Sequence, residues 1–177
     1  MDKQTELKQA LEDALIRNRA MRIFSPWLAS ISEALAMTVS KEHFLTRQET
    51  AALKTRFFDQ VILRQQNREE VYYSVEDKET LSAAMHQLAD TVVDLPSVLF
   101  SDVDRYIGAV RLPAGVILRN AFRVWELVKE DLSFVTEDLE SGFCLEYNYY
   151  DDTHEFVKEG AYELTAWGRL RIEDSTF

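Results

Sequence analysis

Cysteine, proline and glycine are all scarce in this 177-residue chain, which has one Cys, three Pro and five Gly. Because Cys144 is the only cysteine, no disulfide can form within the chain, and this fits a reducing compartment. So few Gly and Pro argue against long disordered linkers and low-complexity tracts. Cytoplasm is the location that we expect.

Long apolar runs are missing as well. The N-terminal residues are charged throughout and lack the apolar segment of a signal peptide. No stretch approaches the roughly 18 uncharged apolar residues of a transmembrane helix. We therefore expect a protein that neither carries a leader nor enters a membrane.

Sequence motifs for catalysis are absent too. The glycines, at 108, 115, 142, 160 and 168, never form the clustered loop that holds a phosphate, and no GxSxG elbow occurs. The histidines at 43, 86 and 154 show neither HExxH nor CxxC spacing around them. Mid-strand Cys144 is expected to be a small packed residue. We expect no enzyme, no cofactor and no bound metal.

The composition that is present suits one domain over residues 1–177. Apolar residues make up 46% of the chain and can fill a core, while the 29% that are charged can cover it. We expect residues 1–93 to be mainly helical and residues 96–172 to combine a helix with a β-meander.

Apolar residues at helical spacing predict four helices in the first half. Leu7, Leu11 and Leu15 mark the first helix, and Ser25-Pro26 predicts the start of a second. Thr46 with Glu49 fits a capping box for the third helix. The fourth is expected over residues 77–92.

Residues 71–75 are β-branched and aromatic, which favours a short strand, whereas residues 95–111 fit either a strand or a helix. A strongly patterned amphipathic helix is expected from Pro113 to about Glu130.

After Asp131 the apolar period changes from 3.6 to 2. Alternating runs over residues 132–136, 143–150 and 161–172 predict antiparallel strands with turns between them. The predicted fold class is α+β, with a helical N-terminal half followed by a central amphipathic helix packed on a C-terminal antiparallel sheet.

Negative charge is concentrated towards the C-terminus. The net charge is −11, and residues 131–177 hold 12 acidic but only 3 basic side chains. Such a field repels phosphate backbones and attracts basic proteins. The alternative interpretation is that the charge serves solubility alone.

Aromatic residues are interleaved with acids in a band over residues 137–163. Rigid aromatic area and charge of one sign are typical of a binding face for a basic protein. The predicted partner-binding residues are Glu137, Asp138, Glu140, Glu146, Tyr147, Tyr149, Tyr150, Asp151, Asp152, Glu155 and, just beyond the band, Trp167. The alternative is that the tyrosines are half-buried core and the acids fill solvated loops.

Three segments of the last third carry a family resemblance: Val124-Trp125-Glu126-Leu127-Val128-Lys129-Glu130-Asp131-Leu132, residues 143–150, and Tyr162-Glu163-Leu164-Thr165-Ala166-Trp167-Gly168. Together they resemble the small acidic immunity proteins of bacterial contact-dependent inhibition and related polymorphic toxin systems. The resemblance implies a cytoplasmic protein that binds and neutralises the toxic domain of a cognate effector, often a basic nuclease. The net charge of residues 1–66, which is +2, departs from that picture.

Two other functions compete with binding. Asp151, Asp152, His154 and Glu155 could form the centre of a metal-dependent enzyme, although Asp is also a common turn residue. Alternatively, a helical regulator could contact nucleic acid through a set of arginines, which overall charge disfavours. Those residues are Arg17, Arg19 and Arg22, or Arg56 and Arg64.

Overall fold

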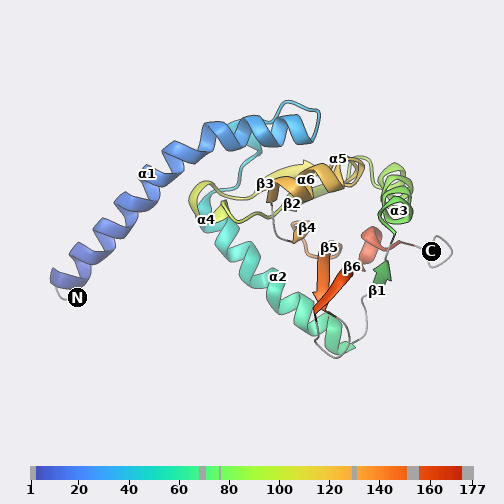
Figure 1. Ribbon diagram of the computed structural model, residues 1–177. Helices are drawn as coiled ribbons and strands as arrows, with labels where there is room; N and C mark the ends of the chain where they lie inside the picture. Colours follow the sequence, from blue (N-terminus) through green and yellow to red (C-terminus); the bar gives the residue numbers. More distant parts are fainter. Residues whose placement is uncertain (1–2, 68–70, 76, 129–130, 151–155, 173–177) are drawn as a thin grey trace.

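The computed structural model describes residues 3–67, 71–75, 77–128, 131–150 and 156–172 (Figure 1). The longer helices are α1 (Lys3–Ala34), α2 (Arg47–Asn67) and α3 (Lys78–Thr91). The shorter ones are α4 (Asp104–Ile107), α5 (Ala114–Arg119), α6 (Ala121–Val128) and the 3-10 turns η1 (Lys41–His43) and η2 (Gly168–Leu170). The strands are β1 (Val71–Val75), β2 (Pro96–Leu99), β3 (Val110–Pro113), β4 (Leu132–Val135), β5 (Gly142–Tyr150) and β6 (Phe156–Trp167).

All six of these strands join one antiparallel sheet in the order β1-β6-β5-β4-β2-β3. β4, β5 and β6 are consecutive neighbours and form the predicted meander. β1 extends the sheet along β6, and the hairpin β2–β3 extends it beyond β4. The hairpin resolves the ambiguous residues 95–111 as strand, short helix and strand. The predicted α+β class, with a helical N-terminal half and a C-terminal sheet, is confirmed.

Helices cover both faces of the sheet (Figure 1). One face packs against the C-terminal part of α1 and against α3, α5 and α6, where the larger apolar core includes Ile31, Leu81, Ile117 and Phe134. The other face packs against α2, and a smaller core there includes residues of α2, the sheet and the β4–β5 turn. Its members are Leu45, Leu53, Phe57, Val98, Phe100, Ala109, Val135, Leu139 and Trp167.

The start of α2 follows the predicted capping box. The Thr46 backbone N–H donates to Glu49 Oε2 at 2.7 Å, and the Glu49 N–H donates to Thr46 Oγ1 at 3.2 Å. These bonds satisfy two amides that a helix start leaves without partners. They also lower the pKa of Glu49, because they stabilise its charged form.

The predicted helix start at Ser25-Pro26 is wrong, because α1 continues through Pro26. The helix bends along its length (Figure 1), as expected where a proline removes a backbone hydrogen bond. Burial of Trp27, Ile31 and Leu35 directly after the proline offsets that loss and holds the helix on the core.

The single long helix predicted after Pro113 is also interrupted. Asn120, between α5 and α6, has φ −117° and ψ 18°, and its side-chain amide donates to the carbonyl oxygens of Val116 at 3.0 Å and Leu35 at 3.4 Å. Competition of this kind between a short polar side chain and the backbone favours a helix end. The last strand also differs from the prediction, since β6 ends at Trp167 rather than at Ile172.

Among the described residues, none of the helices has both the length and the apolar content needed to cross a lipid bilayer.

Candidate binding site between helix α2 and the sheet

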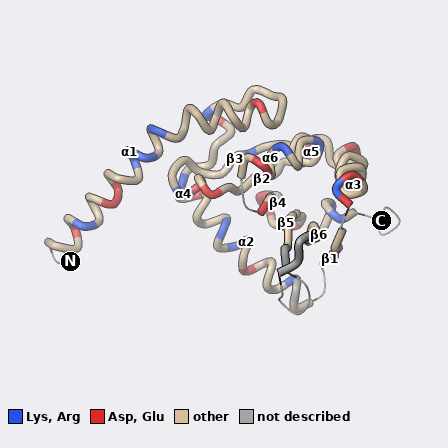
Figure 2. Tube along the Cα trace, in the orientation of Figure 1, with Lys and Arg blue, Asp and Glu red and all other residues tan. Residues whose placement is uncertain are grey.

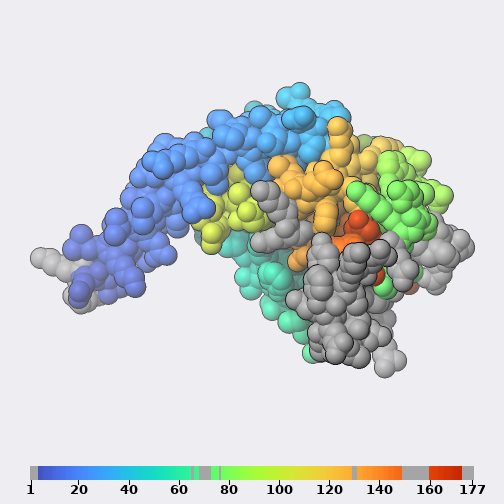
Figure 3. Space-filling model, in the orientation of Figure 1, coloured from blue at the N-terminus to red at the C-terminus, as the bar shows by residue number. Residues whose placement is uncertain are grey.

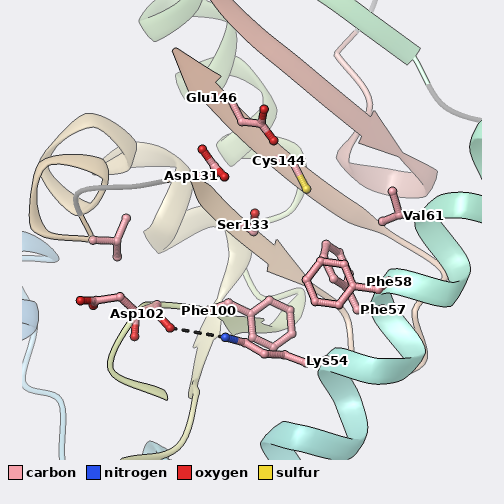
Figure 4. A pocket seen from close by; sticks show the side chains of 12 residues that line it. Lys54, Phe57, Phe58, Val61, Phe100, Asp102, Asp131, Ser133, Cys144 and Glu146 are labelled. Atoms are coloured by element: carbon pink, nitrogen blue, oxygen red, sulfur yellow. Dashed lines mark hydrogen bonds between the residues drawn. The ribbon is translucent and has the colours of Figure 1, made fainter. Parts of the chain in front are cut away.

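A cavity of about 250 Å³ lies between α2 and the sheet (Figure 4). One side is formed by α2, and the other by β4, β5 and the residues that follow β2. Its lining residues are Lys54, Phe57, Phe58, Val61, Phe100, Ser101, Asp102, Val128, Asp131, Ser133, Cys144 and Glu146. Aromatic rings and carboxylates therefore line one cavity that is partly open to solvent.

Strand alternation selects which side chains reach the cavity. Phe143 and Leu145 of β5 point into the larger core, so the intervening Cys144 and the following Glu146 face α2. Cys144 is half-buried in the cavity wall, which agrees with its expected role as a packed residue. Figure 4 shows Glu146 and Asp131 directed towards the same space.

Two adjacent phenylalanines of α2 have different roles. Phe57 is 5% exposed and packs against Phe100 and Trp167, with ring centroids 5.3 and 6.0 Å away. Phe58 is 60% exposed although it borders the cavity, and its ring lies 5.5 Å from that of Phe57. An apolar ring that is so exposed beside a cavity is available to a partner.

At the far end of the cavity the lining residue Lys54 forms an ion pair with Asp104, which does not itself line the cavity. Lys54 Nζ lies 3.1 Å from Oδ2 of Asp104, whose side chain is 1% exposed. Asp104 also accepts hydrogen bonds from the backbone N–H and Oγ of Ser101, at 2.9 and 2.7 Å. Burial nevertheless raises the pKa of Asp104, since loss of water outweighs the lowering effects of Lys54 and Ser101. Lys54 is thus occupied within the protein.

Carboxylates gather at the other end of the cavity. Glu146 and Glu163 are directly opposite each other in the β5–β6 register, on the face that points towards α2. The pKa of Glu146 is raised, first by burial and then by repulsion from Asp131 and Glu163. Glu163 accepts a hydrogen bond from Asn148 Nδ2 at 2.8 Å. Every contribution to the shift of Glu146 opposes its negative charge, so a cation placed there would be stabilised.

The predicted acidic band does not form one patch. Glu137, Asp138 and Glu140 lie in the β4–β5 turn, whereas Glu146 lies beyond the opposite end of β4, since the register already pairs Leu132 with Leu145. Glu146 lies four positions along the strand from Gly142, which corresponds to roughly 14 Å.

Cations of the same chain lie near the acids of the turn. Arg111 Nε is 2.6 Å from Glu137 Oε1, and Arg56 lines a shallow hollow with Asp138 and Glu140. The pKa of Asp138 is lowered mainly by the hydrogen bond that it accepts from Thr136 Oγ1 at 2.5 Å. The acids of this turn therefore have cations of the same chain beside them.

Trp167 is fully buried, so its predicted role as an exposed binding residue is wrong. Its ring packs on Phe57, and its Nε1–H donates to the carbonyl oxygen of Leu139 at 3.2 Å. Gly142, its partner in the register, makes room for the ring, because a Cβ at that position would overlap the indole.

The remaining predicted binding residues are only partly described. Tyr147 is half-buried on the opposite face of the sheet from Glu146, with its ring 4.7 Å from that of Tyr162. The side chains of Tyr149 and Tyr150 lie outside the described structure. So do Asp151, Asp152 and Glu155.

The two competing predictions gain no support from the geometry. In the described ranges no group of three or more His, Cys, Asp or Glu residues is arranged to hold a metal, while Asp151, Asp152, His154 and Glu155 lie outside those ranges. Arg64 donates to the Leu139 carbonyl oxygen at 3.3 Å and lies over the Trp167 ring. The other arginines of the predicted nucleic-acid site are exposed, and one of them, Arg19, stacks on Tyr106.

Sequence reasoning missed the cavity itself. Phe57 and Phe58 are adjacent on a helix, so their side chains point about 100° apart and cannot both face one core. That geometry could have identified Phe58. The proximity of Asp131 to Glu146 depends on strand register, which the sequence pattern alone does not give.

Comparison with known proteins identifies a family for this chain. Residues 31–157 match the YxiF protein family. The chain belongs to this family. The matched region contains α2, the sheet strands from β1 to β5 and all lining residues of the cavity, and it leaves out most of α1. No curated protein and no solved structure matches the chain.

Proposed function

We propose that this member of the YxiF family acts by binding a basic protein partner at the cavity between α2 and the sheet. The observation that carries the proposal is the environment of Glu146, where burial and two neighbouring carboxylates all oppose its charge. A Lys or Arg side chain from a partner would relieve that repulsion. Its binding would be favourable because the two charges would meet in a partly desolvated site.

The shape of the cavity supports the same kind of ligand. Its volume of about 250 Å³ is below the roughly 300–1,000 Å³ of small-molecule sites, and it suits a single inserted side chain. The aliphatic stem of Lys or Arg would pack along Phe57, Phe58 and Phe100, and its cationic end would reach Asp131 and Glu146. Buried anchors of this type dominate the binding energy of protein interfaces.

The proposed partner is the toxic domain of a cognate effector, which would make the chain a cytoplasmic immunity protein. The resemblance of the last third to such proteins suggests this role, and the C-terminal excess of acids would speed encounter with a basic nuclease. Blocking requires only tight binding over the functional surface of the toxin, so no catalytic group is needed here.

The experiment compares the wild type with Asp131→Lys/Glu146→Lys and with Glu140→Lys as the control. Glu140 is an exposed acid at the other end of β4. Tagged proteins would be purified from native cells, and the co-purified partner would be quantified. We expect a stoichiometric basic protein with the wild type and with Glu140→Lys, and its loss with the double variant. An acidic partner, or equal retention by all three proteins, would contradict the proposed site.

The immunity role needs its own measurement. The purified partner's gene would be expressed in a heterologous host with and without each variant. We expect growth arrest by the partner alone, rescue by the wild type and Glu140→Lys, and no rescue by the double variant. A partner that binds at the cavity but does not harm the host would contradict the immunity role and leave the binding role intact.

A further inference from the structure

The N-terminal half of α1 projects away from the rest of the molecule (Figures 1 and 3). Contact with the larger core starts at Trp27 and Leu28. We call residues 3–22 the arm. Leu7, Leu11 and Leu15 of the arm are 72, 63 and 61% exposed, and Met21 is 72% exposed. Four large apolar side chains that are so exposed on one helix form an interaction surface.

Helical periodicity aligns these side chains along the arm. Leu7, Leu11, Ala14, Asn18 and Met21 follow alternating steps of four and three residues, and Leu15 flanks Ala14. This 3.5-residue spacing is the pattern of a seam between two paired helices. A polar residue such as Asn18 in such a seam typically selects the register and the number of helices.

An isolated arm has little to stabilise it. Near its root Arg19 stacks on Tyr106, but the leucines ahead of Arg19 are exposed, and a helical segment with so few tertiary contacts is marginal in water. The arm therefore requires a second surface along its seam. The charge pattern of the arm indicates what that surface is.

Charges divide the arm into two unlike halves (Figure 2). Residues 3–13 carry Glu6, Glu12 and Asp13 against two lysines, whereas the second half carries Arg17, Arg19 and Arg22. Two arms in parallel would place arginines against arginines. Two antiparallel arms would place the acidic half of each copy against the basic half of the other, which is attractive.

A hollow where the arm joins the rest of the molecule adds two basic residues to the three arginines of the arm. Beside Met21, a hollow of about 520 Å³ is lined by Phe24, Phe44 and Ile107 together with Lys41 and Arg47. In an antiparallel pair, the N-terminal leucines and acids of one arm would reach the side of the molecule that holds the apolar and basic residues of this hollow in the other copy.

We propose that two copies of this chain form a symmetric dimer through antiparallel pairing of their arms. The same patch is used on both copies, so the assembly closes at two subunits rather than growing. The interface is separate from the cavity between α2 and the sheet, so the dimer does not depend on the function proposed for that cavity.

The first test measures mass by sedimentation equilibrium for the full chain over a range of concentrations. We expect a dimer for the wild type and a monomer for Leu11→Glu/Leu15→Glu, with the dissociation constant raised more than about tenfold, because one charge would be buried in the apolar seam and the other would lie beside it. Val93→Glu is the matched control, since Val93 is 41% exposed just after α3 and outside the arm. A monomeric wild type, or a double variant that remains dimeric, would overturn the proposal.

The second test uses charge and remains informative if the leucine variant misfolds. One variant carries Arg17→Glu/Arg19→Glu/Arg22→Glu, and a second carries Glu6→Lys/Glu12→Lys/Asp13→Lys. Each alone is expected to be mainly monomeric because like charges oppose each other, and an equimolar mixture is expected to form a heterodimer. Undiminished self-association of both variants, or no complex in the mixture, would contradict the antiparallel pairing.

Discussion

The two faces of the sheet are covered in different ways. Against α1, α3, α5 and α6 the packing is continuous and apolar, and Phe134 and Phe143 stack there with their ring centroids 5.0 Å apart. Against α2 the apolar core is smaller and adjoins a cavity whose lining residue Lys54 is paired with the buried Asp104. One face thus supplies most of the apolar burial, and the other combines burial with polar groups.

This difference separates stability from binding. A dry apolar layer stabilises the fold but offers nothing to a partner, whereas charged groups beside a cavity cost stability and can be satisfied by a ligand. We therefore expect substitutions on the first face to affect unfolding, and substitutions at the cavity to affect mainly association. Four predictions test that division, starting with the largest effect.

Phe134→Ala should lower the free energy of unfolding by about 4 kcal/mol, because it leaves a large void where the side chain is 0% exposed. Phe58→Ala on the α2 face is the contrast. Its ring is 60% exposed, so the loss should stay below about 1 kcal/mol. Urea unfolding of both variants measures the difference, and similar losses would remove the distinction between the faces.

Lys54→Met should cost about 2–3 kcal/mol at neutral pH, since it leaves the Asp104 carboxylate buried without its cation. The raised pKa of Asp104 means that this loss should shrink as the pH falls and the carboxyl takes up a proton. Adding Asp104→Asn to Lys54→Met should recover part of the stability, because the amide oxygen can still accept from Ser101. Unfolding curves at neutral and mildly acidic pH provide the measurement, and a loss independent of pH would argue against the buried charge.

Glu146→Gln should raise the stability of the protein slightly at neutral pH, by less than about 1 kcal/mol because solvent still reaches this partly buried residue and screens its charge. The pKa of Glu146 is raised on folding, so the native state binds the extra proton and stability falls as pH rises through the interval between the ordinary and the raised pKa. The gain should disappear below the ordinary carboxyl range. Thermal unfolding against pH would show it, and a destabilised variant at neutral pH would mean that Glu146 has a stabilising partner.

The smallest effect is expected for Arg111 and Glu137 in the turn region. Their side chains are 42 and 49% exposed, so a double-mutant cycle with Ala at both positions should give a coupling of about 0.5 kcal/mol that salt removes. A coupling several times larger would show that the turn contributes to stability as a buried pair does.

Local signals in the sequence were sufficient for several elements. Thr46 with Glu49 marks the start of α2, and Asp77 caps α3 through the hydrogen bond that its side chain accepts from the Thr80 N–H at 2.9 Å. The period of two after Asp131 identifies the meander, because the apolar residues at alternate positions of β4 and β5 pack into the larger core. These features depend only on neighbouring residues, and this is why they can be read from the chain.

Other features depend on distant contacts and could not be predicted in the same way. Pro26 is held inside α1 by the burial of the residues that follow it, and Asn120 ends α5 partly through Leu35, which is 85 positions away. The alternation did place Trp167 on the same face as Glu163. Only the position of α2 decides that this end of the face is covered, so the sequence could not tell a buried ring from an exposed one.

The three tryptophans lie in three different regions of the molecule, so their fluorescence can report on each region. Trp27 of α1 packs against Phe44, and Trp125 of α6 contacts Tyr162 of β6. Trp167 of β6 packs against Phe57 of α2. Fluorescence from variants that retain one indole each would follow these three regions separately. Loosening of α2 upon ligand entry would then be visible as a red shift from Trp167, while the emission from Trp125 stayed constant.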